Sequence, residues 1–268
     1  MNIITEEFSN ISNLIDALEQ RQVNKVFSHD SLDSQKIENG KDPWSGTKTY
    51  SDAVHLLAYG YDDILEQIKT SLNVPVRNIE NARIPRNDVV GYLPNVPNAL
   101  QGLPNSMINI KTVKKSAKVI NLIYAPVANA SFDPDTFITN GVKILNAINT
   151  LELNGIRVNL KIAFKFSRCG SEHVLATVSV KHESEQLNIK KICFPIAHPA
   201  MLRRIGFKWL ETTKKISSSS WTISYGQSAN DSDFKMLFEN KIGKNTRLIT
   251  LQDIVYMDEM EILEEITS

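Results

Sequence analysis

The sequence has little cysteine, no excess of either charge and no long apolar run. Lys and Arg together number 30, as do Asp and Glu, so the formal net charge is zero. Long-range attraction to nucleic acid or to an anionic membrane is therefore not indicated. The two cysteines, Cys169 and Cys193, lack metal-ligand spacing, and we expect reduced thiols. No apolar run approaches the ~18 residues that a membrane span needs.

Common signatures of catalysis are also missing. No Gly-x-Gly-x-x-Gly follows a predicted strand, and the sequence contains neither a Walker-type phosphate loop nor a Gly-x-Ser-x-Gly elbow. The five histidines are scattered along the chain. We therefore expect no cofactor, no metal and no catalytic residue, although the pattern leaves enzymatic activity open. The amino terminus, MNIITEEFSN, is acidic and polar and does not resemble a signal peptide.

The first part of the chain is expected to be helical and rich in loops. Apolar residues recur at three- and four-residue spacing over residues 1–22, which predicts an amphipathic helix. A polar loop follows. The next helix is expected to begin at Thr49 or Ser51 and to stop at Gly60, and a further helix is expected over residues 61–72.

Prolines then punctuate the segment IPRNDVVGYLPNVPNALQGLPNSMINIK, at Pro85, Pro94, Pro97 and Pro104. This spacing excludes a long helix or a central strand through the prolines. A free linker would be more polar than this segment. We therefore expect an ordered, extended connection that packs on the domain.

From residue 117 onward, apolar strands alternate with helices. AKVINLIYA (117–125) and IRVNLKIAFKF (156–166) predict strands, and the helix predicted over residues 135–155 completes a βαβ unit. The segment HVLATVSVKH then forms an antiparallel hairpin with the second strand. The remaining expected elements are strands over 190–197, 217–226 and 246–254 and helices over 198–215, 231–243 and 257–266.

This order of elements resembles the von Willebrand factor A-type fold over residues 115–268. The resemblance implies an α/β class: a doubly wound, mostly parallel, Rossmann-like sheet with one antiparallel edge strand. The expected domains are a helical and Pro-rich N-terminal extension packed on the core, residues 1–112, and the α/β domain, residues 113–268. A fold alone does not give a function.

Three segments resemble an uncharacterised family of tailed-bacteriophage proteins. They are WSGTKTYSDAVHLLAYG, GYLPNVPNALQGLPNSMIN and FPIAHPAMLRRIGFKWLE, and the resemblance spans nearly the whole chain. It implies a bacteriophage origin and a location in the host cytoplasm or the virion. The family carries no activity that could be transferred to this chain.

The A-type fold usually holds Mg²⁺ through an Asp-x-Ser-x-Ser motif at the end of its first strand, because hard oxygen ligands suit that ion. In this sequence Ala125, Val127 and Asn129 stand in those places, so we expect no such metal site. Other oxygen-bearing side chains follow in the same loop. Those for which capping of the next helix is the simpler explanation are Ser131, Asp133 and Asp135.

In a sheet of A-type order, the strands 117–125 and 190–197 would be neighbours, and their carboxyl ends would form the crevice in which such sheets bind ligands. The segment after the second strand begins a helix, whose N-terminus favours anions. Two interpretations remain: a site for an anion or a peptide carboxylate, and a capped helix whose arginines are solvated or paired with acidic side chains. The candidate binding residues of this crevice are Asn129, Ser131, Asp133, Asp135, His198, Arg203 and Arg204.

Trp44 and Tyr50 have two interpretations as well: they dock a loop on the domain, or they form a partner-binding anchor. Together these patterns favour a non-enzymatic adaptor or scaffold that binds a phage or host protein. By analogy with A-type domains, that protein would be an AAA+ ATPase. The alternatives are a virion structural component and a metal-dependent hydrolase or nuclease that uses the crevice carboxylates.

Overall fold

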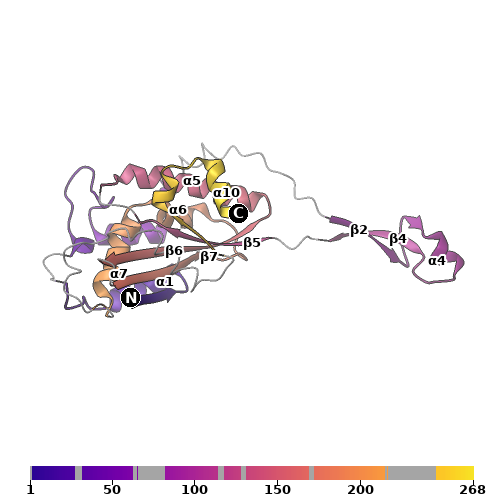
Figure 1. The fold of residues 1–268 in the computed structure, drawn as a ribbon, viewed down its shortest axis with the longest axis horizontal. Helices are drawn as coiled ribbons and strands as arrows, with labels where there is room; N and C mark the ends of the chain where they lie inside the picture. Colours follow the sequence, from indigo (N-terminus) through magenta and orange to yellow (C-terminus); the bar gives the residue numbers. More distant parts are fainter. Residues whose placement is uncertain are drawn as a thin grey trace. The chain divides into compact units, whose positions relative to one another are not determined.

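The computed structural model describes residues 2–27, 32–62, 65, 82–113, 118–127, 131–168, 172–214, 216 and 246–268 (Figure 1). The chain divides into two compact units, which we call the body (residues 1–74 and 119–268) and the insert (residues 75–118). This division differs from the expected boundary between residues 112 and 113. The N-terminal residues belong to the body because strand β1 (Asn2–Phe8) is part of its sheet.

The described strands of the body form one sheet in the order β1-β7-β6-β5-β8. The β1/β7, β5/β6 and β5/β8 pairs are parallel, and β6/β7 is antiparallel. The predicted α/β class with a mostly parallel sheet is thus confirmed. The antiparallel strand β7 does not lie at the edge, however, because β1 pairs with its other side. The bounds are β5 Val119–Ala125, β6 Arg157–Arg168, β7 Glu172–Lys181 and β8 Thr246–Thr250.

Several predicted elements are present. Helix α5 (Pro134–Leu153) connects β5 to β6, with Pro134 in its first turn and Gly155, at φ 77°, just beyond its end. Helix α2 (Tyr50–Tyr59) has Thr49 as N-cap in a capping box and Gly60 as C-cap. The other described helical segments are α1 Ile11–Gln20, η2 Asp33–Gln35, α6 Ile189–Ala197, the π-helix η3 Met201–Gly206, α7 Phe207–Thr212, α9 Leu251–Ile254 and α10 Glu259–Thr267.

Three predictions of secondary structure are wrong. Residues 190–197 belong to helix α6, not to a strand, so the neighbour of β5 opposite β6 is β8. The segment 1–22 contains strand β1 before helix α1. The predicted strand over 246–254 ends at Thr250, whose side chain caps α9. The strand predicted over 217–226 and the helix predicted over 231–243 lie outside the described residues.

The main hydrophobic core joins one face of the sheet to the described helices of the body. Alternate residues of β6, among them Leu160, Ile162 and Phe164, point into it, as the two-residue period of a strand requires. Side chains from α1, α2, α5, α6, η3, α7, α9 and α10 pack against them. On the opposite face, the described residues form a smaller cluster of sheet residues and Val127. No described helix of the chain is both long enough and apolar enough to cross a membrane.

The insert has a small antiparallel sheet of its own in the order β2-β4-β3, with the short helix α4 (Val96–Leu100). Its strands are β2 Ala82–Asp88, β3 Leu93–Pro94 and β4 Met107–Val113. Pro85 and Pro94 lie on the outer strands, where a missing N–H is tolerated, and the central strand β4 has no proline. The Pro-rich segment is therefore a folded unit of its own and not only an extended connection.

Candidate functional site

The segment FPIAHPAMLRRIGFKWLE spans the end of α6, the π-helix η3 and α7. His198 is the C-cap of α6, and its backbone N–H donates to the Phe194 carbonyl. All six residues of η3 are buried, including both arginines. A π-turn inside a helix is uncommon and often lies at a functional site. The partners of the buried polar side chains decide whether this one binds a ligand or holds the fold.

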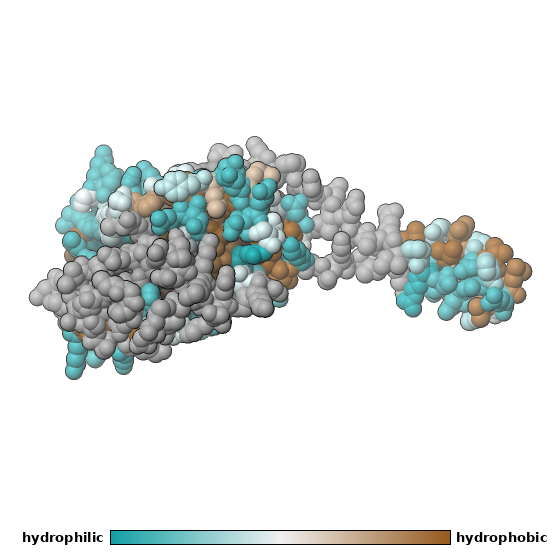
Figure 2. Space-filling view, in the orientation of Figure 1, coloured by the Kyte–Doolittle hydropathy of each residue, from teal (hydrophilic) through white to brown (hydrophobic). Residues whose placement is uncertain are grey.

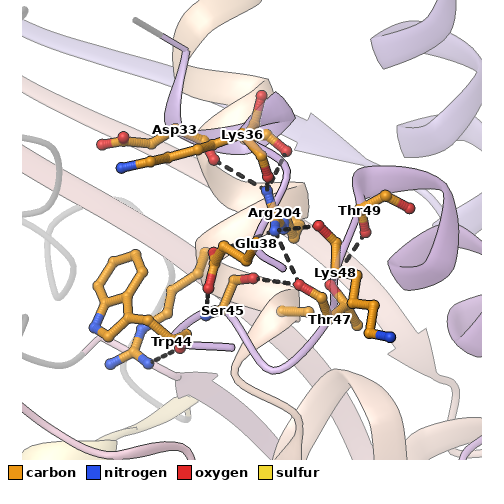
Figure 3. A network of polar contacts seen from close by, with 12 residues as sticks. Asp33, Lys36, Glu38, Trp44, Ser45, Thr47, Lys48, Thr49 and Arg204 are labelled. Carbon is orange, nitrogen blue, oxygen red and sulfur yellow. Dashed lines mark hydrogen bonds and ion pairs between the residues drawn. The ribbon is translucent and has the colours of Figure 1, made fainter. Parts of the chain in front are cut away.

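Arg204 is fully buried, and its guanidinium is surrounded by backbone carbonyls (Figure 3). One of its terminal nitrogens, Nη2, also donates to an acidic side chain, the carboxylate of Glu38, at 3.2 Å. Burial lowers the pKa of the guanidinium, and Glu38 is the largest of the acidic groups that oppose this shift. The carbonyl acceptors belong to Asp33 (3.2 Å), Ser34 (3.1 Å), Lys36 (2.6 Å), Thr47 (2.9 Å) and Lys48 (3.1 Å).

These contacts organise residues 33–48, which otherwise form loop and a single 3-10 turn. The Ser45 backbone N–H donates to the second oxygen of Glu38 at 3.2 Å, and its hydroxyl donates to the Thr47 carbonyl at 2.8 Å. Glu211 acts from α7, where its carboxylate accepts hydrogen bonds from the backbone N–H and the hydroxyl of Ser34. Buried carbonyls need donors, and the arginine supplies several at once.

Arg203 lies between two aromatic rings. Its guanidinium carbon is 4.0 Å from the centre of the Trp44 ring and 4.7 Å from that of Phe137 on α5. It also donates to the backbone carbonyls of Trp44 and Phe132. Burial lowers the pKa of this guanidinium to about 10, so it remains charged at neutral pH. Arg203 thus fastens the loop that carries Trp44 to the start of α5.

His198 is buried and lies between two rings, stacked on Phe194 at 4.7 Å and edge-on to Tyr61 at 4.8 Å. Its Nδ1 accepts a hydrogen bond from the Ala200 backbone N–H at 3.1 Å, which places the proton of the neutral ring on Nε2. Burial lowers its pKa to about 4. The turn at Gly46 (φ 78°) covers this region, since a Cβ there would lie 2.6 Å from Pro199 Cγ.

The predicted crevice residues do not form one open site. Arg203 and Arg204 are buried and committed to carbonyl oxygens, which agrees with the interpretation as a structural helix and not with solvated arginines. Arg203 of the π-helix η3 contacts Phe132 in the segment before α5, and this link is made by a helix and not by the ends of neighbouring strands. Ser131, Asp133 and Asp135 are exposed, and Asp133 is the N-cap of α5 without a side-chain cap bond. Asn129 lies outside the described residues.

Trp44 and Tyr50 mainly dock the loop and α2 on the body. The Trp44 ring is partly exposed but packs against Arg203 and, at 6.2 Å, against the ring of Phe207. Tyr50 begins α2, and Lys208 Nζ lies 5.8 Å from the centre of its ring. Burial raises the pKa of the Tyr50 hydroxyl, and the charges of Glu19 and Glu211 raise it further.

A polar hollow of about 480 Å³ lies at the start of α1, beside the adjoining ends of β6 and β7. Two of the lysines that line it are already paired with carboxylates: Lys161 with Glu7, and Lys181 with Glu152 at 2.6 Å. Glu185 lies in the wall as well. The hollow is therefore close to electrical balance. Elsewhere in the described parts of the chain, no group of three or more His, Cys, Asp or Glu side chains is arranged to hold a metal ion.

Two buried or half-buried acidic residues that hold the body together, Glu6 and Glu211, were not identified from the sequence. Together with Arg203 and Arg204 they form what we call the buried framework. Glu6 of β1 accepts hydrogen bonds from Trp209 Nε1 at 2.7 Å and from both terminal nitrogens of Arg21. Glu211 is fully buried, and its carbonyl accepts from the Asn24 backbone N–H at 2.8 Å. The only signal was their position, because each acidic residue occupies a place where the apolar pattern expects a core side chain.

The sheet and its buried polar framework define a mixed α/β protein with a mostly parallel central sheet. A family model described as "Domain of unknown function (DUF7192)" matches residues 2–267, and the chain belongs to this family. No curated protein and no solved structure matches the chain.

Proposed function

We propose that this protein is a non-enzymatic scaffold that acts by binding protein, and that the insert is its binding module. The observation that carries the proposal is the surface of the insert. Of the fourteen large apolar side chains that are exposed in the described residues, eight belong to the insert. Exposed apolar patches of more than a few hundred Å² are typical of interaction sites.

The buried framework of the body also supports a role without catalysis. The charged groups that could act on a substrate, Arg203 and Arg204, hold the fold together instead. His198 is stacked between rings, and its Nδ1 is already occupied. The polar hollow of the body is lined by lysines of which two are paired with carboxylates, which suits a scaffold better than a hydrolase.

The setting of the scaffold follows from the resemblances. The likeness of three segments to a tailed-phage family supports a phage-encoded protein in the host cytoplasm or the virion. By analogy with A-type domains, whose order of elements the sequence resembles, the proposed partner is an AAA+ ATPase, and a virion structural role is the alternative. Both roles require protein contacts and neither requires catalysis.

Photo-crosslinking in producing cells tests the proposal. Benzoylphenylalanine replaces Tyr92 of the insert, which is 62% exposed, and in a matched control it replaces Tyr256 of the body, which is 84% exposed. We expect a covalent protein adduct at position 92 that disappears when Val90→Asp and Leu100→Asp are added. Mass spectrometry with and without ATP then separates a motor ATPase from virion proteins. No adduct at position 92 beyond that at position 256 would refute the binding role of the insert.

A further inference from the structure

One stretch of the insert carries no charged residue. From Val89 to Ile110 the sequence contains no Asp, Glu, Lys, Arg or His, although charged residues make up 22% of the whole chain. Asp88 precedes this stretch and Lys111 follows it, and on the neighbouring strand β2 Arg86 pairs with Asn109 of β4. Charge depletion with retained apolar and amide side chains is typical of the centre of a protein interface.

Most of the exposed apolar side chains of this surface lie on the turn after β2, on β3 and on α4, and Figure 2 shows hydrophobic residues on the outside of this unit. Val96 and Leu100 are four residues apart and therefore share one face of α4. None of the side chains described between residues 85 and 110 is buried. The eight exposed ones, each exposing between 41% and 84% of its surface, are Val89, Val90, Tyr92, Leu93, Val96, Leu100, Leu103 and Ile110.

The amount of exposed apolar surface fits a protein interface. Eight side chains of this size, exposed to this degree, present an apolar area on the order of 800 Å², which is about what each partner contributes to an interface of standard size. A small sheet needs a covered hydrophobic face to be stable. The insert has the face, and its own described side chains do not cover it.

The edges of the small sheet are poorly suited to recruiting another strand. Pro85 lies on β2 and Pro94 on β3, so each outer strand lacks an N–H that an added strand would need. Arg86 adds a charge to the β2 edge. The contact is therefore expected to form through side chains and not through backbone pairing.

We infer that the partner on this surface is the same surface of a second copy of the chain, an inference that rests on the proposed function and names its partner. In a two-fold symmetric contact the same patch lies on both sides, so each residue meets the same residue of the other copy or a residue close to it. Like charges across such a contact would repel. The stretch from Val89 to Ile110 has no charged residue, and a charged partner would find no opposite charge on it. Two inserts packed face to face give each small sheet the apolar cover that it lacks.

The test uses the purified full-length chain alone. Sedimentation equilibrium over about two orders of magnitude in concentration measures the dimer dissociation constant. We expect a monomer–dimer equilibrium whose Kd rises by about thirtyfold or more in the double variant Val90→Asp with Leu100→Asp, because each copy places two carboxylates in the contact. The matched control is Tyr256→Asp with Met260→Asp on the body, where both side chains are 65% exposed or more. It should leave the Kd unchanged.

A second measurement does not depend on these variants. Benzoylphenylalanine at position 92 of the purified chain should give a crosslinked dimer, and the same group at position 256 should not. A monomer at all concentrations, or a dimer that persists in the Val90→Asp and Leu100→Asp variant, overturns the inference. If the purified chain is monomeric but position 92 captures another protein in cells, self-association is wrong and the binding role of the insert stands. If neither preparation gives an adduct, both are wrong.

Discussion

The guanidinium of Arg203 lies 4.0 Å above the ring of Trp44, and it donates to the carbonyl of that same residue. One side chain thus holds both the ring and the backbone of a loop residue more than 150 positions away. Stacking of this kind requires a planar cation, and Arg and Lys are not interchangeable at such a place.

The first prediction concerns Arg203→Lys. The lysine keeps the charge but loses the flat surface and one of the two donors, so we expect the free energy of unfolding to fall by about 2 kcal/mol. Urea denaturation measures the change. The matched control is Arg86→Lys, an exposed arginine of the insert, which should change stability by less than about 0.5 kcal/mol. Equal effects of the two variants would show that the stacked geometry is not what matters.

The second prediction concerns Arg204→Met, which removes the donor for five backbone carbonyls, two of them in buried hydrogen bonds, and leaves Glu38 without its cation. We expect a loss of about 3–5 kcal/mol, the range for breaking a buried ion pair from one side. Because Arg204 anchors residues 33–48, trypsin should also cleave faster at the exposed residues Lys36, Lys41 and Lys48. A loss of stability without faster cleavage there would contradict the anchoring role.

These arginines show why the sequence could indicate a location but not a role. The spacing placed His198, Arg203 and Arg204 at the start of a helical segment, which is nearly where they are. Their partners are carbonyls of residues 33–48 and Phe132, which belong to loops without a periodic pattern. A free arginine and one with every terminal donor occupied look alike in a sequence.

The wrong prediction at α6 has a physical cause. The run ICFPIA is apolar throughout, and a buried helix and a buried strand then give the same pattern. A proline disfavours the interior of a helix, yet Pro195 is accommodated inside α6. The strand β1 was hidden for a different reason. Ile4, Glu6 and Phe8 have the two-residue spacing of one strand face, but Glu6, which is paired with Arg21 and hydrogen-bonded by Trp209, interrupts the apolar pattern.

Elements with strong local signals were predicted well. The caps of α2 at Thr49 and Gly60, the proline at the start of α5 and the β-branched run of β5 depend on neighbours in the sequence, and all are present. The insert as a folded unit was not predicted, because four prolines favoured an extended segment. They are compatible with a sheet since those within strands lie on its outer strands.

The third prediction concerns the pH dependence of stability. His198 has a folded-state pKa of about 4, against an ordinary value of 6.5, because it is buried. Between these values the unfolded chain takes up a proton that the folded chain does not, so stability falls as the pH falls through this window. The contribution is about 1.4 kcal/mol per pH unit and is absent above the window, where both states are neutral.

Urea denaturation of the wild type and of His198→Asn from about pH 8 to about pH 4 isolates this contribution. The asparagine oxygen can still accept from the Ala200 N–H, and the difference at about pH 8, where both states hold a neutral ring, gives the cost of lost packing. We expect the wild type to lose stability faster than the variant as the pH drops below about 6.5. Parallel pH profiles would show that the buried imidazole is protonated in the folded state.

The fourth prediction concerns Gly141, where helix propensity and packing oppose each other. In the middle of α5, alanine would favour the helix by about 1 kcal/mol over glycine. A Cβ at this position, however, would lie 2.4 Å from both Cα and Cβ of Ala197, so α5 and α6 would have to move apart. Overpacking of a core typically costs about 1–3 kcal/mol, and here the obstacle is backbone that cannot rotate away.

We therefore expect Gly141→Ala to lower the free energy of unfolding by about 2 kcal/mol, measured by urea denaturation, with packing outweighing propensity. Gly40→Ala is the control, since nothing lies within 4 Å of a Cβ there, and it should be close to neutral. A stabilising effect of Gly141→Ala would mean that the two helices are not in close contact at this point. The position of α6, and with it the arginine framework that follows α6, would then need revision.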